Sequence, residues 1–235
     1  QGLGHIRKNR SAQGILLLAA VANFVGFTYG QTLLPVVARD VFKTGPMGLG
    51  LLMTALGVGA LIASLAVANS PRLLNFVIID MKGDPNLKQL SRLPHVVGFF
   101  SAAEYKDRQH LIISYVTRAI TSLDSEIKSR MQLLSTAGIS GDIFDYNRRY
   151  AQTPLPHLLI IIDEFGKFKT DFNSPELMDK LVEVAAIGRQ PGVHLLLCTQ
   201  SPTGVVSTKI EANANFRICL RVANIDESRS ILKRR

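Results

Sequence analysis

Short, almost wholly apolar runs rich in Ile, Val and Leu are the feature of this sequence that most limits its fold. Three of these runs lie at residues 75–80, 158–163 and 193–199, and each ends in a polar or acidic residue. Continuous apolar runs of this length are typical of strands buried on both faces of a parallel sheet. A fourth run of the same kind, at residues 217–222, predicts one more strand.

Helical patterns separate these predicted strands. Between residues 116 and 134 apolar side chains recur at spacings of three and four, and Gly138 follows where a helix would stop. Residues 174–188 predict a second helix, which would begin at a Ser-Pro pair and end at a glycine. Alternating strands and helices predict an α/β fold with a parallel sheet for residues 71–235.

The run at residues 158–163 carries the clearest chemical signal. It reads LLIIID and is followed by Glu164, so two carboxylates lie at the carboxyl end of a buried strand, where α/β sheets bind their ligands. This is the form of a Walker B motif. Asp163 would then hold Mg²⁺ through water, and Glu164 would orient and deprotonate the water that attacks a γ-phosphate. The alternative is an apolar strand ending in a polar turn whose acids are merely solvated.

Polar residues also follow the neighbouring predicted strands. Thr199 and Gln200 end the run at 193–199, and a Gln at that place can sense a γ-phosphate by hydrogen bonding. Asp80 ends the first run and Lys82 follows it. Lys82 is a candidate contact to a nucleotide or to a neighbouring subunit, and a solvated turn is the alternative.

Arginines near the later predicted strands are candidates for neutralising phosphate charge. A guanidinium suits phosphate geometry, and a surface salt bridge is the alternative for each arginine. The candidates are Arg189, Arg217 and Arg221.

The sequence lacks the other half of a P-loop ATPase site. Such a site needs a glycine-rich turn ending in Gly-Lys-Ser/Thr, whose backbone N–H groups, Lys and hydroxyl hold the phosphates and Mg²⁺. The one Gly-Lys pair, Gly166-Lys167, is followed by Phe and comes after the predicted Walker B motif. We therefore expect little or no ATP hydrolysis, because the preorganised groups that stabilise phosphoryl transfer are missing.

Two long stretches without charge lie near the start of the chain. Residues 11–38 and 44–71 each hold 28 uncharged positions, and about 20 apolar residues span a bilayer as a helix. The chain has 27 Lys and Arg against 18 Asp and Glu, and three of the basic residues cluster at 7–10, which predicts a cytoplasmic start. The sequence thus predicts an all-α hairpin of two transmembrane helices over residues 1–70. Two buried helices of a soluble protein are the alternative.

Two groups of sequence motifs resemble known protein families. Residues 2–66, with GLGHIRKNR and LPVVARDVF, resemble a fragment of a major facilitator superfamily transporter. The motifs NFVIIDMKGD, LPHLLIIIDEFGKF and AAIGRQPGVHLLLCTQSPTG, within residues 61–232, resemble FtsK/SpoIIIE ATPases, and within them the EccC/EssC ATPases of type VII secretion. At two places the wording departs from that family, which usually has Gln-Arg-Pro where this chain has Gln200-Ser-Pro and often has Lys-Gly-Gly where it has Lys82-Gly-Asp.

The ATPase resemblance implies a RecA-like P-loop NTPase core that uses ATP and Mg²⁺. It implies assembly with like subunits or tandem ATPase domains in a ring, and a DNA or secreted-protein substrate. Asp163 and Glu164 would be Walker B, with Mg²⁺ on Asp163, and Gln200 would be the sensor. The residues expected to bind the cofactor are Asp80, Lys82, Thr199, Arg217 and Arg221.

The two resemblances overlap at residues 61–68, so we expect two unrelated segments joined there. Residues 1–70 would hold the chain at the cell inner membrane, and residues 71–235 would form a cytoplasmic ATPase domain without Walker A and short of the family's closing segment. One alternative is a transporter fragment with an unrelated tail. Another is an assembly module that forms rings without hydrolysing ATP.

Overall fold

The chain divides into two units, Gln1–Ala55 and Leu56–Arg235. The structure is a computed structural model, and every residue that it describes belongs to the second unit. The described residues are 57, 59–105, 109–199, 205–214, 216–218 and 229.

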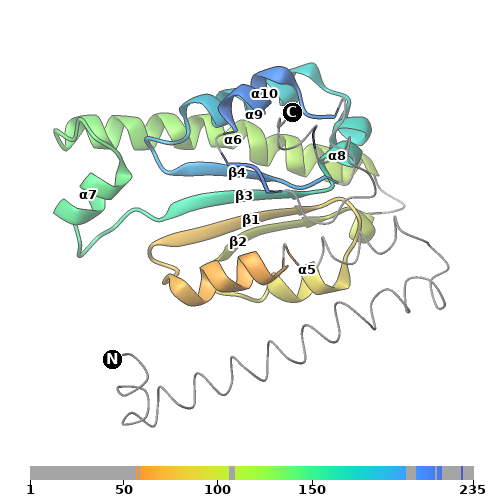
Figure 1. Cartoon of the computed structure of the whole chain (residues 1–235), viewed down its shortest axis with the longest axis horizontal. Helices are drawn as coiled ribbons and strands as arrows, with labels where there is room; N and C mark the ends of the chain where they lie inside the picture. Colours follow the sequence, from red (N-terminus) through yellow and green to blue (C-terminus); the bar gives the residue numbers. More distant parts are fainter. Residues whose placement is uncertain are drawn as a thin grey trace, which may run out of the picture. The chain divides into compact units, whose positions relative to one another are not determined.

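A parallel sheet forms the centre of the second unit (Figure 1). Its four strands lie in the spatial order β2-β1-β3-β4, and all neighbours pair in parallel. The strands are β1 (Leu74–Asp80), β2 (Val96–Ser101), β3 (His157–Asp163) and β4 (Val193–Leu197). This confirms the predicted α/β class and its parallel sheet.

The apolar runs form strands because the sheet is covered on both faces. Ile78 and Ile161 point to one face, while Ile79, Ile160 and Ile162 point to the other, and all five are 0% exposed. The predicted strand at residues 217–222 is not confirmed, because residues 216–218 are outside any strand and the rest lies outside the described residues.

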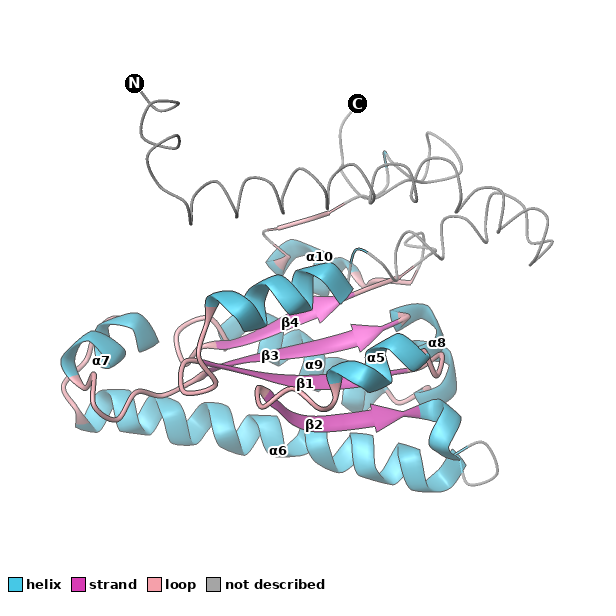
Figure 2. Ribbon diagram, turned by 90° about the horizontal axis from the view of Figure 1, so that it is seen from below, coloured by secondary structure: helices cyan, strands magenta, loops and turns pink. Residues whose placement is uncertain are grey.

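Helices cover each face of the sheet (Figures 1 and 2). The face with Ile160 and Ile162 packs against helices that follow β2, β3 and β4, and the opposite face packs against helical residues 59–68 and α5 (Pro85–Leu90). The helices of the first face are α6 (Gln109–Thr136), α8 (Phe165–Phe172), α9 (Pro175–Ile187) and α10 (Thr208–Asn213). Two short elements, η3 (Ala102–Tyr105) and α7 (Ile143–Arg149), complete the described part.

The two predicted helices are confirmed, and their ends follow the predicted signals. Gly138 follows α6 with a φ of 67°, a left-handed conformation that glycine adopts without a steric penalty. Ser174 caps α9, because its hydroxyl accepts a hydrogen bond from the backbone N–H of Leu177. Gly188 is the C-cap residue of α9.

The predicted transmembrane hairpin is not confirmed. Its first stretch, residues 11–38, lies outside the described residues. Of the second stretch, residues 59–68 form a helix whose Ile62 and Ala66 are buried against the sheet with Phe76. Within the part of the chain that the structure describes, no helix is both long and apolar enough to span a bilayer.

A pair of histidines lies near the amino-terminal ends of β3 and β4. His157 Nδ1 and His194 Nε2 are 3.2 Å apart, and the ring centroids are 5.5 Å apart at an interplanar angle of 14°. The two ring nitrogens are therefore close enough for one imidazole to donate an N–H hydrogen bond to the other. Burial lowers the pKa of both histidines, and the cation of Arg130 lowers it further.

Acid should therefore destabilise the fold through this pair. The pKa of each histidine lies below its unfolded value of 6.5, so the unfolded chain binds more protons and stability decreases as the pH falls below about 6.5. Urea unfolding at pH 7.5 and 5.5 measures this effect. The free energy of unfolding should decrease more between these pH values for the wild type than for the double variant His157→Gln/His194→Gln. An equal loss in both proteins would contradict this expectation.

Candidate functional site at the carboxyl edge of the sheet

Acidic and hydroxyl side chains meet at the carboxyl edge of the sheet. Asp80 ends β1, Asp163 ends β3 and Ser101 ends β2, and Asp80 is the register partner of both other residues. Thr199 follows β4, two residues beyond its last residue. The parallel pairing thus brings together residues that are far apart in the sequence.

Asp80 organises the turn that follows β1. Its side chain is 0% exposed. Oδ1 accepts hydrogen bonds from the backbone N–H groups of Lys82, at 3.0 Å, and Gly83, at 2.7 Å. Oδ2 accepts a bond from the Ser101 hydroxyl at 2.9 Å. Gly83 has a φ of 78°, which a side chain would disfavour, so both the carboxylate and the glycine fix this turn.

Glu164 is held at both of its carboxylate oxygens. Lys82 Nζ lies 3.2 Å from Oε2, and the Thr199 hydroxyl donates to Oε1 at 3.2 Å. Glu164 is also the N-cap residue of α8 and has a left-handed backbone, with φ 59° and ψ 70°. A non-glycine residue adopts this conformation only where its surroundings impose it, which is frequent at functional sites.

The surroundings of Asp163 disfavour the charged form of its carboxyl group. The pKa of Asp163 is raised to about 6, chiefly by burial; the cation of Lys82 opposes the shift, and the carboxylates of Asp80, Glu164 and Asp84 add to it. Burial raises the pKa of the Cys198 thiol to about 12, with a further contribution from the carboxylates of Asp163 and Glu164. A bound divalent cation would relieve this concentration of negative charge, so the residues present fit Mg²⁺ at Asp163.

Removing the charge of Asp163 should stabilise the fold. Because its pKa is about 6 in the fold and 3.8 unfolded, the folded chain binds more protons between these values and loses stability as the pH rises through them. We expect Asp163→Asn to raise the free energy of unfolding by about 2 kcal/mol at pH 8 and to have little effect at pH 3.5. Denaturant unfolding of both proteins at each pH measures this difference. A gain that persists unchanged at pH 3.5 would contradict the electrostatic origin.

The structure gathers most of the predicted site residues and leaves others elsewhere or undescribed. Asp80, Lys82, Asp163, Glu164 and Thr199 lie at this edge. A guanidinium nitrogen of Arg217 donates to the backbone carbonyl of Glu211 on α10 at 2.9 Å. Gln200 and Arg221 lie outside the described residues, so their roles stay predictions.

No metal cluster was found among the described side chains. There, no three His, Cys, Asp or Glu residues are arranged to hold an ion together. Mg²⁺ is commonly held by one or two carboxylates, water and phosphate, so the predicted site on Asp163 does not need such a cluster.

Ser101 is the residue of this edge that the sequence analysis missed. The run VVGFFS at residues 96–101 is a strand that also ends in a polar residue, and this signal was available. What the sequence does not show is that β2 pairs with β1, which brings the Ser101 hydroxyl to Asp80.

Comparisons with known proteins agree with this fold. Residues 55–204 match the FtsK/SpoIIIE family. The ESX secretion system protein EccC of Geobacillus thermodenitrificans is 37% identical over 197 residues, which cover 80% of this chain and 13% of that protein. The type VII secretion system protein EssC of Staphylococcus aureus is 34% identical over 197 residues, with the same coverage.

A solved structure shows the same architecture. The cytoplasmic domain of the Thermomonospora curvata type VII secretion ATPase EccC is similar with a TM-score of 0.62 and 29% identity. The match covers 74% of this chain and 20% of that one. This chain therefore spans only a small part of the length of the relatives it matches.

Sheet, site and comparisons together define an α/β domain of ATPase type. The chain belongs to the FtsK/SpoIIIE family, and it is related to the EccC/EssC ATPases of type VII secretion. The predicted resemblance to these ATPases is confirmed. The matches give no support to a transporter segment, and the family match begins at residue 55, inside the range that resembled one.

Proposed function

We propose that residues 71–235 form a translocase ATPase domain whose nucleotide would lie at the carboxyl edge of the sheet. The observation that carries this proposal is the position of Asp163 and Glu164 at the end of β3, beside Lys82 and Thr199. Parallel α/β sheets bind ligands at this edge. The conjugation coupling protein TcpA of pCW3, which shares the fold, has been solved with ATPγS.

The residues at this edge suit separate parts of phosphoryl transfer. Asp163 would hold Mg²⁺, which when bound neutralises phosphate charge. Glu164 would orient the attacking water and accept its proton. Gln200 would sense the γ-phosphate, and Thr199 and Lys82 would line the same edge. Arg217 or Arg221 would neutralise charge, in this subunit or its neighbour.

Direct contact between Asp80 and the cofactor stays a prediction. Both of its carboxylate oxygens already accept hydrogen bonds, from the turn and from Ser101. This supports an indirect role for Asp80.

We further propose that this chain hydrolyses little or no ATP, because it lacks the Gly-Lys-Ser/Thr turn. Residues 57–61 read Gly-Val-Gly-Ala-Leu just before and within the helical segment 59–68, where Ala60 and Leu61 stand in place of the Lys and Ser of a P-loop. Without that lysine and hydroxyl, the β- and γ-phosphates lose a cation and Mg²⁺ loses a ligand.

Restoring this turn tests the proposal. The variant Thr54→Gly/Ala60→Lys/Leu61→Ser carries a complete P-loop pattern, and we expect it to gain MgATP binding that the wild type lacks, measured by fluorescence of a labelled ATP. Adding Asp163→Asn should weaken the gain. Absence of any gain would contradict a nucleotide site at this edge. ATP turnover by the wild-type chain that Glu164→Gln abolishes would contradict its inactivity.

For the cargo, we propose a secreted protein rather than DNA. The relatives named above are type VII secretion proteins, and Thermomonospora curvata EccC ATPases 2 and 3 have been solved with a signal sequence peptide. Assembly with like subunits or tandem ATPase domains, and a cytoplasmic position at the membrane, belong to the same proposal. A transporter fragment is not favoured by any described residue.

A further inference from the structure

A chain of contacts crosses three strands at the carboxyl edge of the sheet and ends on Glu164. It starts at Ser101 on β2, passes through Asp80 on β1 and the turn after β1, and reaches Glu164 after β3 through Lys82. The two atoms of each contact are 3.2 Å apart or less. Consecutive contacts of this kind can restrict the position of the last side chain, that of Glu164.

The first links fix the backbone of Lys82. Asp80 is completely buried, so its carboxylate has to be satisfied by protein groups, and the groups available are two backbone N–H donors of the turn and the Ser101 hydroxyl. The positive φ of Gly83 lets the chain turn back over that carboxylate. The backbone of Lys82, from which its side chain extends, is therefore held in one position.

The last link fixes the carboxylate of Glu164. The side chains of Lys82 and Glu164 are 26% and 14% exposed, so their ion pair is partly shielded from water. The Thr199 hydroxyl holds the other oxygen. Glu164 is thus restrained from two sides and by its left-handed backbone.

We propose that Lys82 is a positioning residue for Glu164, supported by Asp80 and Ser101, and is not a phosphate ligand. This inference rests on the proposed function, in which Glu164 handles the attacking water. Each carboxylate oxygen makes one of these contacts and keeps a second lone pair that can accept a hydrogen bond from the attacking water. The assignment gives Ser101 a role in the site and makes the role of Asp80 indirect.

A substitution at Gly166 can displace the Glu164 carboxylate at the oxygen that Thr199 contacts. A Cβ atom at this position would lie 3.2 Å from Glu164 Oε1 and 3.7 Å from Thr199 Oγ1, which is tight for the carboxylate. Gly166 lies in the first turn of α8, where alanine is a better helix former than glycine. Gly166→Ala should therefore move the carboxylate without weakening the helix.

The test follows the side-chain carboxyl ¹³C resonance of Glu164 at one pH in the full chain labelled with ¹³C-glutamate. Glu164→Gln identifies the resonance by its loss. We expect Lys82→Met and Gly166→Ala to shift it, Ser101→Ala to shift it less, and Lys82→Arg to restore most of the wild-type position. Lys88→Met is the matched control, because Lys88 pairs with Glu104 at 2.9 Å in an exposed position, and it should leave the resonance unchanged.

A double-mutant cycle adds a second readout. Lys82→Met and Glu164→Gln should be non-additive by about twofold or more in the unfolding equilibrium constant, because removing one partner removes the interaction. If Lys82→Met fails to fold, Gly166→Ala and Ser101→Ala still report on the resonance. An unchanged resonance in Lys82→Met and Gly166→Ala, or additive effects in the cycle, would overturn the assignment.

Nucleotide binding separates this inference from the proposed function. The measurement is made in the variant with the restored P-loop. If Lys82 only positions Glu164, Lys82→Met should change the Kd for MgATP by less than about threefold. If Lys82 binds phosphate, losing its cation should raise the Kd about tenfold or more. A tenfold rise would overturn the inference. Absence of nucleotide binding in every variant, with the resonance shifts intact, would instead count against the proposed function alone.

Discussion

Replacing Arg130 by Met is expected to lower the free energy of unfolding by about 3 kcal/mol, because one buried and one partly buried carbonyl group would lose their donor. The Arg130 side chain is 7% exposed, and one guanidinium nitrogen donates to Pro156 O at 2.7 Å and to Pro191 O at 3.1 Å. These carbonyls belong to the segments that lead into β3 and β4. Arg130 therefore ties α6 to the amino-terminal ends of both strands.

Lys128 on the same helix provides a matched control. It forms an ion pair with Asp124 four residues before it, as Arg130 does with Glu126, and both pairs measure 2.7 Å. The Lys128 side chain is 70% exposed, so Lys128→Met should cost no more than about 0.5 kcal/mol. Urea unfolding of the two variants at pH 7.5 measures the contrast, and equal effects would contradict it. Arg130→Met should also raise the pKa of His157 and His194, because the cation that lowers both would be gone.

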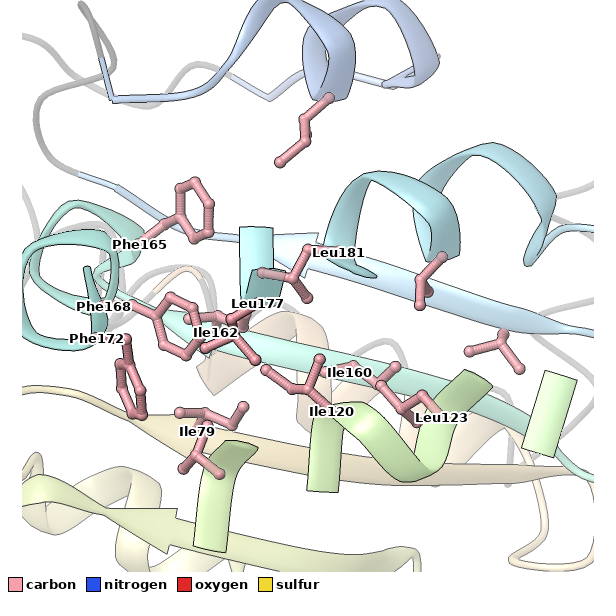
Figure 3. Packing of buried hydrophobic residues seen from close by; sticks show 14 of the residues in the cluster. Ile79, Ile120, Leu123, Ile160, Ile162, Phe165, Phe168, Phe172, Leu177 and Leu181 are labelled. Carbon is pink, nitrogen blue, oxygen red and sulfur yellow. The ribbon is translucent and has the colours of Figure 1, made fainter. Parts of the chain in front are cut away.

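Phe168→Ala is expected to destabilise the fold by about 3–5 kcal/mol, because it removes a whole ring from the larger core cluster. Phe168 is 0% exposed and packs between Phe165 and Phe172 of α8, at ring centroid distances of 5.9 and 4.5 Å. Figure 3 shows the ring between α8 and the sheet, near Ile162 and Leu177. The cavity would lie directly behind the turn that carries Glu164.

Phe216→Ala is the control for this truncation. Phe216 is 82% exposed, so little apolar surface returns to water when its ring is removed, and we expect a change within about 0.5 kcal/mol. Thermal or urea unfolding of the two variants gives the comparison. A loss below about 1 kcal/mol for Phe168→Ala would mean that α8 does not hold its place in the core as the structure shows.

The pattern of apolar residues along the chain was enough to predict the main strands and helices of the fold. The runs that became β1, β3 and β4 were visible because strands buried on both faces need apolar residues at every position. α6 and α9 were visible because each buries one stripe and ends at a glycine. The uncharged stretch at residues 44–71 was predicted as a second membrane helix with a buried helix as the alternative, and in its described part Ile62 and Ala66 are buried against the sheet. A helix packed on a sheet and a bilayer helix can have the same composition, so the pattern alone does not separate the two.

The candidate site was predicted in part. Asp163, Glu164, Thr199, Asp80 and Lys82 were found because each follows an apolar run, and the carboxyl ends of parallel strands share an edge. Their partners were not predicted. Nothing in the local sequence pairs Lys82 with Glu164, which is 82 positions further along the chain.

The sequence by itself determined the class of fold, the acidic pair at the end of a buried strand and the absence of a phosphate-binding lysine turn, because each depends on residues adjacent in the chain. Only the tertiary structure decided which strands are neighbours, and with them the contact of Ser101 with Asp80 and the hold on Glu164. Those contacts join strands whose order along the chain differs from their order in the sheet, so they depend on pairing between segments that are distant in the sequence.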